Sequence, residues 1–212
     1  FQIAYCPERV LPGNVMHELV HNDRVIGGVD ENSTQKAIAF YGQFVKGELH
    51  STNARTAEMC KLTENSSRDV QIAFANELSL ICDKADINVW ELITLANKHP
   101  RVQILQPGVG VGGHCIPVDP LYLTWWARQN GGRASFVESA DSINHDMPKY
   151  VAERALKLVS SSVRKPRVLI LGVAYKPGVG DVRETPVAEL RNHLSALGAI
   201  VAWHDPLVPI WE

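Results

Sequence analysis

Hydrophobic and polar positions divide the first half of the chain into two stretches. In residues 1–53 the runs FQIAYC, RVIGGV, KAIAFYGQFV and ELHST predict strand, strand, helix and strand. Asp30 to Thr34 offer side chains that could cap the start of that helix. Residues 54–98 carry apolar positions at helical spacing, and neither Pro nor Gly interrupts them from Arg55 to Lys98. Because one helix of that length is unusual, we predict two, with a break near residues 83–88.

The second half opens with a segment of different character. Residues 99–120 are rich in Gly and Pro and predict a loop held between helices. Helical composition returns afterwards, and we expect breaks at Asn130-Gly131-Gly132 and at Pro148. A polar linker, 161–165, then precedes a buried-strand run, a helix and a further strand, which together form one βαβ unit.

These patterns predict an α/β protein with three parts. An α/β layer covers residues 1–53, an all-helical domain covers 54–160, and the beginning of a second α/β domain covers 161–212. The chain begins with Phe1 inside a predicted strand and stops shortly after another. We therefore expect it to be a fragment of a longer protein.

Composition and charge narrow the classes of function. The 212 residues are 45% hydrophobic, which is ordinary for a globular protein. A formal net charge of -2 and a pI near 6.5 provide no basic surface for nucleic acid, so we expect no nucleic-acid partner. No apolar run approaches the roughly 20 residues of a membrane helix, so no membrane is expected. Four cysteines without a CxxC pair or a secretory signal predict free thiols in a reducing cytoplasm.

The segment GVGVGGHCIPVD, residues 108–119, is the strongest candidate for chemistry. Its glycines let the backbone approach a ligand closely and expose N–H groups. Cys115 at the edge of such a loop is a candidate nucleophile, because a thiolate needs access and nearby N–H groups or positive charge. The alternative is a buried structural cysteine in a tight turn.

The same segment satisfies GxGxxG, but we reject a dinucleotide site there. Pro117 and Pro120 interrupt HCIPVDP, so we expect that no helix opens after the glycines. No acidic residue follows on a second strand. His114 and Cys115 lack a second pair at ligand spacing, so we expect no metal.

Charged residues elsewhere are candidates for stabilising a reacting group. Lys61 and Asn65 share a helical face, and a fixed cation there could stabilise an oxyanion. Lys176 and Arg183 follow a strand and precede a helix, where an α/β sheet binds phosphate. Glu8 follows the first strand and could act as a base. The alternative for Lys61 is a snorkelling lysine at the surface, and the alternative for Lys176 and Arg183 is a solvated loop.

Several motifs together resemble one enzyme family. CPERVLPG (6–13), NDRVIGG (22–28), TAEMCKLTEN (56–65), IAFANELSLIC (72–82), INVWEL (87–92), HPRVQILQPGVGVGGHCIPVDP (99–120) and GVAYKPGVGDVRETP (172–186) are similar to the UDP-glucose/GDP-mannose dehydrogenase family. The resemblance covers nearly the whole chain, and the motifs follow in the family's order.

The resemblance implies a fold and a reaction. The expected fold is the end of a Rossmann-like NAD-binding domain, an all-helical central dimerisation domain and the start of a Rossmann-like UDP-binding domain. The family oxidises the C6 alcohol of a nucleotide sugar to a carboxylate with two NAD molecules. The similarity is greatest to the branch that acts on UDP-N-acetyl-D-mannosamine, and UDP-glucose and UDP-N-acetylglucosamine are the alternatives. A homodimer or larger homo-oligomer is implied.

The resemblance also implies roles for the residues that could react. Cys115 matches the nucleophile that holds the aldehyde as a thiohemiacetal and later as a thioester. Lys61 matches the lysine that stabilises the oxyanion. Asn65 and Asp119 match hydrogen-bonding partners near the reacting oxygen or water, and Glu8 matches a carboxylate near the hydrolytic water.

Four further residues match positions that bind ligands. Arg101 matches an arginine that reaches the sugar-nucleotide site of a neighbouring subunit. Gly112 matches a loop glycine whose backbone contacts substrate, and Lys176 matches a substrate-contacting lysine. Arg183 matches an arginine that approaches the NAD phosphates.

A second class of function is open for the chain as it stands. It could be a non-catalytic dimerisation and UDP-sugar-binding fragment. Without the family's glycine-rich phosphate loop it should bind NAD poorly, because most pyrophosphate contacts would be missing. A cysteine hydrolase or acyltransferase is disfavoured, since no His–Asp/Asn partner set is apparent for Cys115.

Overall fold

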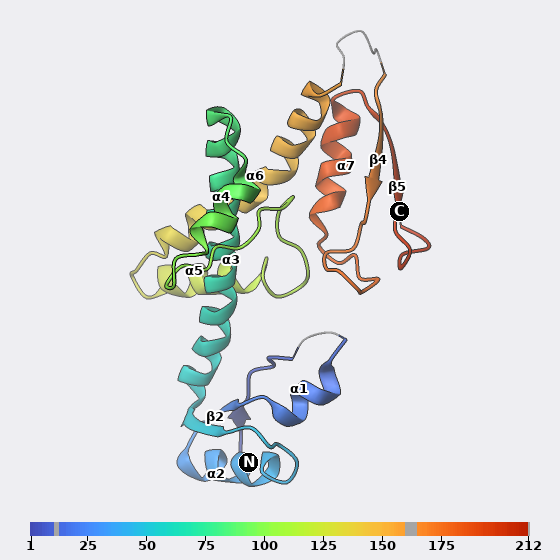
Figure 1. Cartoon of the computed structure of the whole chain (residues 1–212). Coiled ribbons are helices and arrows are strands. Elements are labelled where there is room, and N and C mark those ends of the chain that lie inside the picture. The colour runs from blue at the N-terminus through green and yellow to red at the C-terminus, as the bar shows by residue number, and fades with distance from the viewer. Residues whose placement is uncertain (11–12, 160–164, 212) are drawn as a thin grey trace. The chain divides into compact units, whose positions relative to one another are not determined.

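The computed structural model describes residues 1–10, 13–159 and 165–211. These form two compact units, Phe1–Asn65 and Ser66–Glu212, which are described separately (Figure 1). One helix of 32 residues, α3 (Ala54–Ala85), contributes residues to both. The predicted boundary between residues 160 and 161 lies outside the described residues, and the domain limits stay predictions.

The first unit is built on a three-stranded mixed sheet. Its strands are β1 (Ala4–Tyr5), β2 (Arg24–Gly28) and β3 (Leu49–Asn53), and β2 pairs parallel with β3 and antiparallel with β1. The helix α2 (Glu31–Tyr41) connects β2 to β3. The three predicted strands and this helix are therefore confirmed.

A short helix in this unit was not predicted. The helix α1 (Val15–His21) has seven residues, and none of them is buried. A helix without a buried stripe leaves no hydrophobic period in the sequence, which is why the pattern analysis missed it.

Two glycines at the end of β2 allow close packing in the first unit. A Cβ added to Gly27 would lie 2.3 Å from the carbonyl oxygen of Asn53, and one added to Gly28 would lie 2.4 Å from the nitrogen of Thr34. The Thr34 hydroxyl accepts the Gly28 N–H at 2.9 Å. The glycines therefore serve contacts within the protein at this position.

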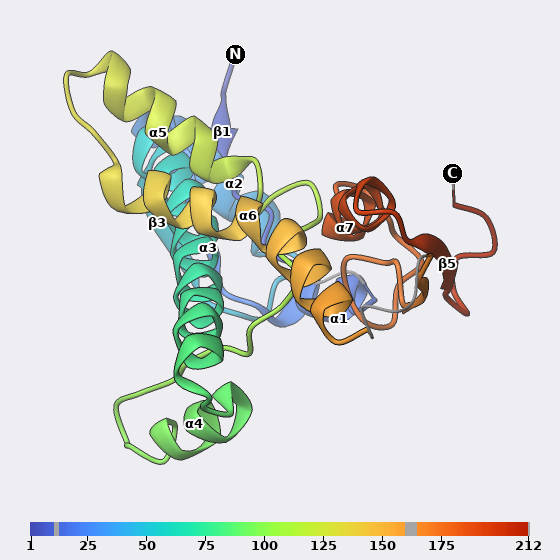
Figure 2. The same cartoon turned by 90° about the horizontal axis from the view of Figure 1, so that it is seen from above.

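Helices dominate the first part of the second unit. Beyond the C-terminal part of α3 come α4 (Val89–Ala96), α5 (Asp119–Gln129) and α6 (Ser135–Lys157). The predicted break after α3 is confirmed, and the Asn88 side chain accepts N–H groups of Trp90 and Glu91 to begin α4. The break at residues 130–132 is also confirmed. Figure 2 shows α5 lying alongside α6.

Two expectations about proline were wrong. The helix α6 continues through Pro148. The missing N–H costs one bond to the carbonyl of Asn144, but burial of Met147, Pro148 and Ala152 holds the helix in place. A helix also opens within the stretch that follows the glycines, because α5 begins at Asp119. Pro120 lies in its first turn, where an N–H would have no helical partner.

The second unit ends in the predicted βαβ arrangement. Strands β4 (Arg167–Leu171) and β5 (Ile200–His204) are parallel, and α7 (Pro186–Ala196) connects them. Figure 1 shows α7 between α6 and this sheet. The core between them is formed by buried apolar residues: Ala152, Ile170, Val173, Val187, Leu190, Leu194 and Val208. No helix in the described part of the chain is long and apolar enough to cross a membrane.

Candidate active site

The first unit brings Glu8 and Lys61 together. The Lys61 Nζ donates a hydrogen bond of 2.6 Å to the backbone carbonyl of Glu8, across 53 residues of sequence. The Glu8 carboxylate accepts the N–H of Val10 at 2.5 Å. Asn65 lies one turn further along α3 than Lys61, as the spacing predicts. Two of the predicted catalytic residues are therefore neighbours in space.

An ion pair fastens the same segment to α3. The Arg9 guanidinium meets the Glu64 carboxylate with N···O distances of 2.9 and 3.2 Å. Glu64 lies one helical turn from Lys61, so adjacent residues of the segment after β1 contact adjacent turns of the helix. Lys61 is half-buried and its ammonium group contacts protein.

In the second unit the glycine-rich loop packs against the segment that follows β4. The Gly113 N–H donates to the carbonyl of Arg183 at 3.1 Å. A Cβ on Gly112 would lie 2.7 Å from the Cβ of Tyr175 and 2.8 Å from the carbonyl oxygen of Glu184. Gly113 has a φ of +87° and faces the Tyr175 ring. Glycine is required here by close backbone approach and by left-handed conformation.

Cys115 lies where this loop enters α5. Its carbonyl accepts the N–H groups of Val118 at 3.1 Å and Asp119 at 2.8 Å, so Cys115 and Asp119 are separated by one helical turn. The thiol is half-buried and free. Arg183 lies within its electrostatic range. The structure therefore places Cys115 in the electrostatic environment of Arg183, with Asp119 one helical turn further along the chain.

That cation is already paired. The Arg183 guanidinium binds both carboxylate oxygens of Asp181, and its hydrogen bonds lower the pKa of Asp181 to about 2. The Arg183 side chain is nevertheless 61% exposed and accessible to a ligand. Lys176 is half-buried in the same loop, next to Tyr175.

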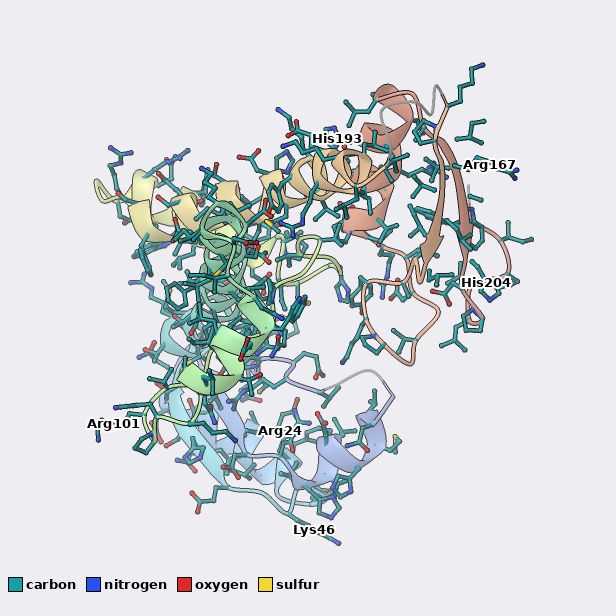
Figure 3. The ribbon with its side chains drawn as sticks, turned by 45° about the horizontal axis from the view of Figure 1, so that its top comes forward. Arg24, Lys46, Arg101, Arg167, His193 and His204 are labelled. Carbon is teal, nitrogen blue, oxygen red and sulfur yellow. The ribbon has the colours of Figure 1, made fainter. Side chains whose placement is uncertain are left out.

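Arg101 is separate from these groups. It follows α4, its side chain is exposed, and Figure 3 shows it projecting outward. Among the described residues, Arg101 makes no hydrogen bond or ion pair to another candidate site residue.

The dinucleotide interpretation of residues 108–113 is excluded by the backbone. No strand occurs in residues 101–118, so the glycines are not part of a strand–turn–helix unit. The helix that follows β2 does not fit a pyrophosphate either, because the Asp30 carboxylate already caps it by accepting the Ser33 N–H at 2.7 Å. Within the described ranges, no residues form a pyrophosphate cradle, and no cluster of His, Cys, Asp or Glu could hold a metal.

A cavity of 470 Å³ adjoins the glycine-rich loop. Val111 and Pro117 line it together with Asp69, Asp141 and Asn144. Asp69 is 2% exposed, and burial raises the pKa of its carboxyl group to about 6, with Asp141 adding to the rise and the Asn144 amide opposing it. Sequence reasoning missed Asp69, because an acid on a helix normally lies on the solvated face.

Comparison with known proteins identifies the parts of the chain. Residues 1–45 match the NAD binding domain of the UDP-glucose/GDP-mannose dehydrogenase family, residues 55–146 its central domain, and residues 169–212 its UDP binding domain. The chain belongs to the UDP-glucose/GDP-mannose dehydrogenase family. This confirms the predicted fold class, with a helical central domain between parts of two α/β domains.

Members of the dehydrogenase family with known names are closely similar. UDP-N-acetyl-D-mannosamine dehydrogenase of Campylobacter jejuni is 54% identical over 198 residues, which cover 93% of this chain and 48% of that protein. NDP-N-acetyl-D-galactosaminuronic acid dehydrogenase of Ralstonia solanacearum is 51% identical over 189 residues, covering 89% and 44%. The structure of UDP-D-ManNAc dehydrogenase from Pyrococcus horikoshii matches with a TM-score of 0.90 and 42% identity, covering 98% of this chain and 50% of that one. The chain spans about half the length of the curated relatives it matches.

The close approach at Gly112 predicts an effect of adding one methyl group. Gly112→Ala should lower the free energy of unfolding of the second unit by about 1–3 kcal/mol, because the loop must move away from Tyr175. Gly108→Ala is the matched control, since a Cβ there meets nothing within 4 Å, and its effect should stay within about 0.5 kcal/mol. Urea unfolding measures both, and equal effects would contradict the packing explanation.

The buried Asp69 predicts a pH dependence of stability. Between its ordinary pKa of 3.8 and about 6, the folded protein holds a proton that the unfolded chain has released. Raising the pH through this window should therefore destabilise the fold, and Asp69→Asn should remove that contribution. Denaturant unfolding at several pH values compares the two proteins, and parallel curves would show that Asp69 does not titrate in this range.

Proposed function

We propose that this chain is part of an NAD-dependent 6-dehydrogenase that converts UDP-N-acetyl-D-mannosamine into UDP-N-acetyl-D-mannosaminuronate for surface polysaccharide. The names of the similar proteins support an oxidoreductase acting on nucleotide sugars. The match of residues 169–212 to a UDP binding domain supports the nucleotide. Four unbridged cysteines favour a reducing compartment such as the cytoplasm.

The contact between Lys61 and Glu8 is the observation that carries the proposal. These are the residues for which the family resemblance implies oxyanion and proton roles, and they are 2.6 Å apart through Nζ and a carbonyl oxygen. A fixed ammonium group beside a carboxylate-bearing residue suits a reaction that develops negative charge on oxygen and then releases a proton. Cys115, on its glycine-rich loop, supplies the nucleophile.

The residues of this chain act in a defined order. The Cys115 Sγ bonds to the aldehyde carbon C6, and the Lys61 ammonium stabilises the oxygen that becomes negative. Asn65 and Asp119 hydrogen-bond near that oxygen and the attacking water. After the second oxidation, water adds to the thioester carbon, Glu8 accepts a proton, and the C–S bond breaks to restore the thiol. NAD, when bound, accepts the hydride in each oxidation.

The described residues fit only a minor part of the NAD site. The Asp30 cap and the course of residues 101–118 leave no cradle for the pyrophosphate. We therefore assign that cradle to the part of the parent protein that this chain does not span. Arg183 would contribute by exchanging part of its pairing with Asp181 for a cofactor phosphate. By itself, the chain would act as a binding module with weak affinity for NAD.

Exposed apolar side chains support a homo-oligomer. Phe74 and Ile81 on α3 are 50% and 56% exposed, and Trp125 on α5 is 60% exposed. Phe74 and Ile81 are seven residues apart and therefore share one face of α3, and an exposed apolar helix face is typical of association surfaces. The outward projection of Arg101 supports a role in a neighbouring subunit's substrate site (Figure 3).

The identity of the sugar is the most specific part of the proposal. UDP-glucose and UDP-N-acetylglucosamine are the alternative substrates. The Ralstonia relative, named for an N-acetylgalactosaminuronic acid, is nearly as similar as the Campylobacter one. An N-acetylated sugar is common to both names and is therefore the better-supported class.

Cys115→Ala in the full-length parent should abolish uronate formation, because no other thiol is placed on this loop to hold the aldehyde. Cys60→Ala is the control, since Cys60 is also half-buried but lies on α3. Uronate is measured by chromatography after incubation with UDP-N-acetyl-D-mannosamine and NAD. A normal yield from Cys115→Ala would overturn the nucleophile assignment.

A further inference from the structure

Buried amide side chains connect two helices to the start of the glycine-rich loop. Asn76 on α3 is 0% exposed, and its Oδ1 accepts the N–H of Gly108 at 2.8 Å. Its Nδ2 donates to the Oδ1 of Asn144 on α6 at 2.9 Å. Asn144 is also buried, and its Nδ2 donates to Asp69 on α3, at 2.7 Å to the carboxylate and 3.1 Å to the backbone carbonyl. We call Asp69, Asn144 and Asn76 the amide relay.

Only one orientation of the two amide side chains in the relay is compatible with these hydrogen bonds. A backbone N–H can only donate, so Asn76 must turn its oxygen toward Gly108 and its NH₂ group toward Asn144. Asn144 must then accept with its oxygen and donate with its nitrogen. The Asp69 carboxylate can only accept hydrogen bonds, so the Asn144 nitrogen, and not its oxygen, must face Asp69. Each member therefore determines the orientation of the next, although Asn76 is the only one whose side chain bonds to the loop.

A second contact from α6 reaches the loop two residues later. A Cβ on Gly110 would lie 3.1 Å from the backbone carbonyl oxygen of Asn144, the carbonyl that loses its helical partner at Pro148. Gly110 has a φ of +136°. The backbone of Asn144 thus approaches the loop at Gly110, whereas its side chain reaches Gly108 only through Asn76.

Burial of the Asp69 carboxylate costs free energy of folding, so core packing alone does not explain why an acid occupies this position. Its Oδ2 has no hydrogen-bond partner among the described residues. Burial of a carboxylate with an unpartnered oxygen is unfavourable. An Asn or an apolar residue would avoid this cost, but neither would offer Asn144 acceptors alone.

We propose that the amide relay positions the loop that carries Cys115 for reaction. Asp69, Asn144 and Asn76 are positioning residues, since they act through Gly108 and do not reach the reacting atoms. The consequence for catalysis rests on the proposed function of Cys115. The consequence for the accessibility of the Cys115 thiol is independent of that proposed function.

Alkylation of individual cysteines in the full-length parent tests the relay. Asn76→Leu removes both side-chain hydrogen bonds of Asn76 at similar volume. Ser79→Ala is the control, since the Ser79 hydroxyl donates to the backbone carbonyl of Asn76 and its removal leaves the Asn76 side-chain hydrogen bonds in place. Iodoacetamide labelling is followed for each cysteine by peptide mass spectrometry. Cys115 should react about tenfold faster in Asn76→Leu, as expected for the loss of one or two buried hydrogen bonds. The Ser79→Ala protein should match the wild type.

Cys82 reports whether the whole second unit has loosened. It lies on α3 and is 2% exposed, so it reacts only when this unit opens. A rise confined to Cys115 supports positioning. If Cys82 accelerates too, Asn144→Ser decides, because it frees the Asn76 amide without adding bulk. An unchanged Cys115 rate, or a rise shared with Cys82 in both variants, would overturn the proposal.

Kinetics give a readout that a purely structural role would not change. In Asn76→Leu, kcat should fall by roughly 10- to 100-fold while KM for UDP-N-acetyl-D-mannosamine stays within about threefold, because the nucleophile is misplaced and the binding surface is kept. The double variant Asn76→Leu/Asn144→Leu should resemble Asn76→Leu alone, since the two act in series. Additive losses would contradict a relay. Failure of the proposed function would show separately, as uronate formed by Cys115→Ala.

Discussion

The glycine-rich loop depends on the hydrogen bond between the Gly113 N–H and the carbonyl of Arg183. Residues 101–118 contain no helix or strand, so hydrogen bonds and packing from elsewhere must fix their course. At 3.1 Å this bond fastens the loop to the segment after β4, and the lack of a side chain at Gly112 lets the two backbones approach. The opposite end is held by Asn76 through Gly108. Cys115 therefore comes from an irregular segment whose position is determined by contacts with α3, α6 and the βαβ unit.

The charged residues discussed above differ in how they are paired and how far they are buried. Asp181 and Arg183 pair at the surface, where solvent screens them, and an exposed guanidinium remains accessible to an anionic ligand. Asp69 is buried, and its carboxylate contributes direction to the amide relay at some expense of stability. In the first unit, Lys61 meets a carbonyl oxygen and the neighbouring Arg9–Glu64 pair ties the same segment to α3. Each of these charged groups thus has a structural partner within the protein.

Much of the fold could be predicted from hydrophobic periodicity. The three strands of the first unit, a helix beginning near residue 54 and the terminal βαβ unit all appear in the structure where the pattern predicts them. The helix through Pro148 and the start of α5 at Asp119 could not be predicted from local rules, since burial overrides the missing N–H in one case and Pro120 occupies a favourable first-turn position in the other. Spacing indicated Lys61 with Asn65, but the contact of Lys61 with Glu8 depends on how the segment after β1 meets α3. Asp69, Asn76 and Asn144 gave no local signal, because polar residues on helices usually face water.

In the proposed reaction, Cys115 holds an aldehyde through a second oxidation. Oxidising an alcohol to a carboxylate removes four electrons and requires two NAD molecules, whereas a simple alcohol dehydrogenase stops after one. The most direct measurement is the number of NADH formed per UDP-N-acetyl-D-mannosamine consumed by the full-length parent, with UDP-glucose as the comparison substrate. We expect two NADH per sugar and little reaction with UDP-glucose. One NADH per sugar, with aldehyde as the product, would contradict the proposed reaction.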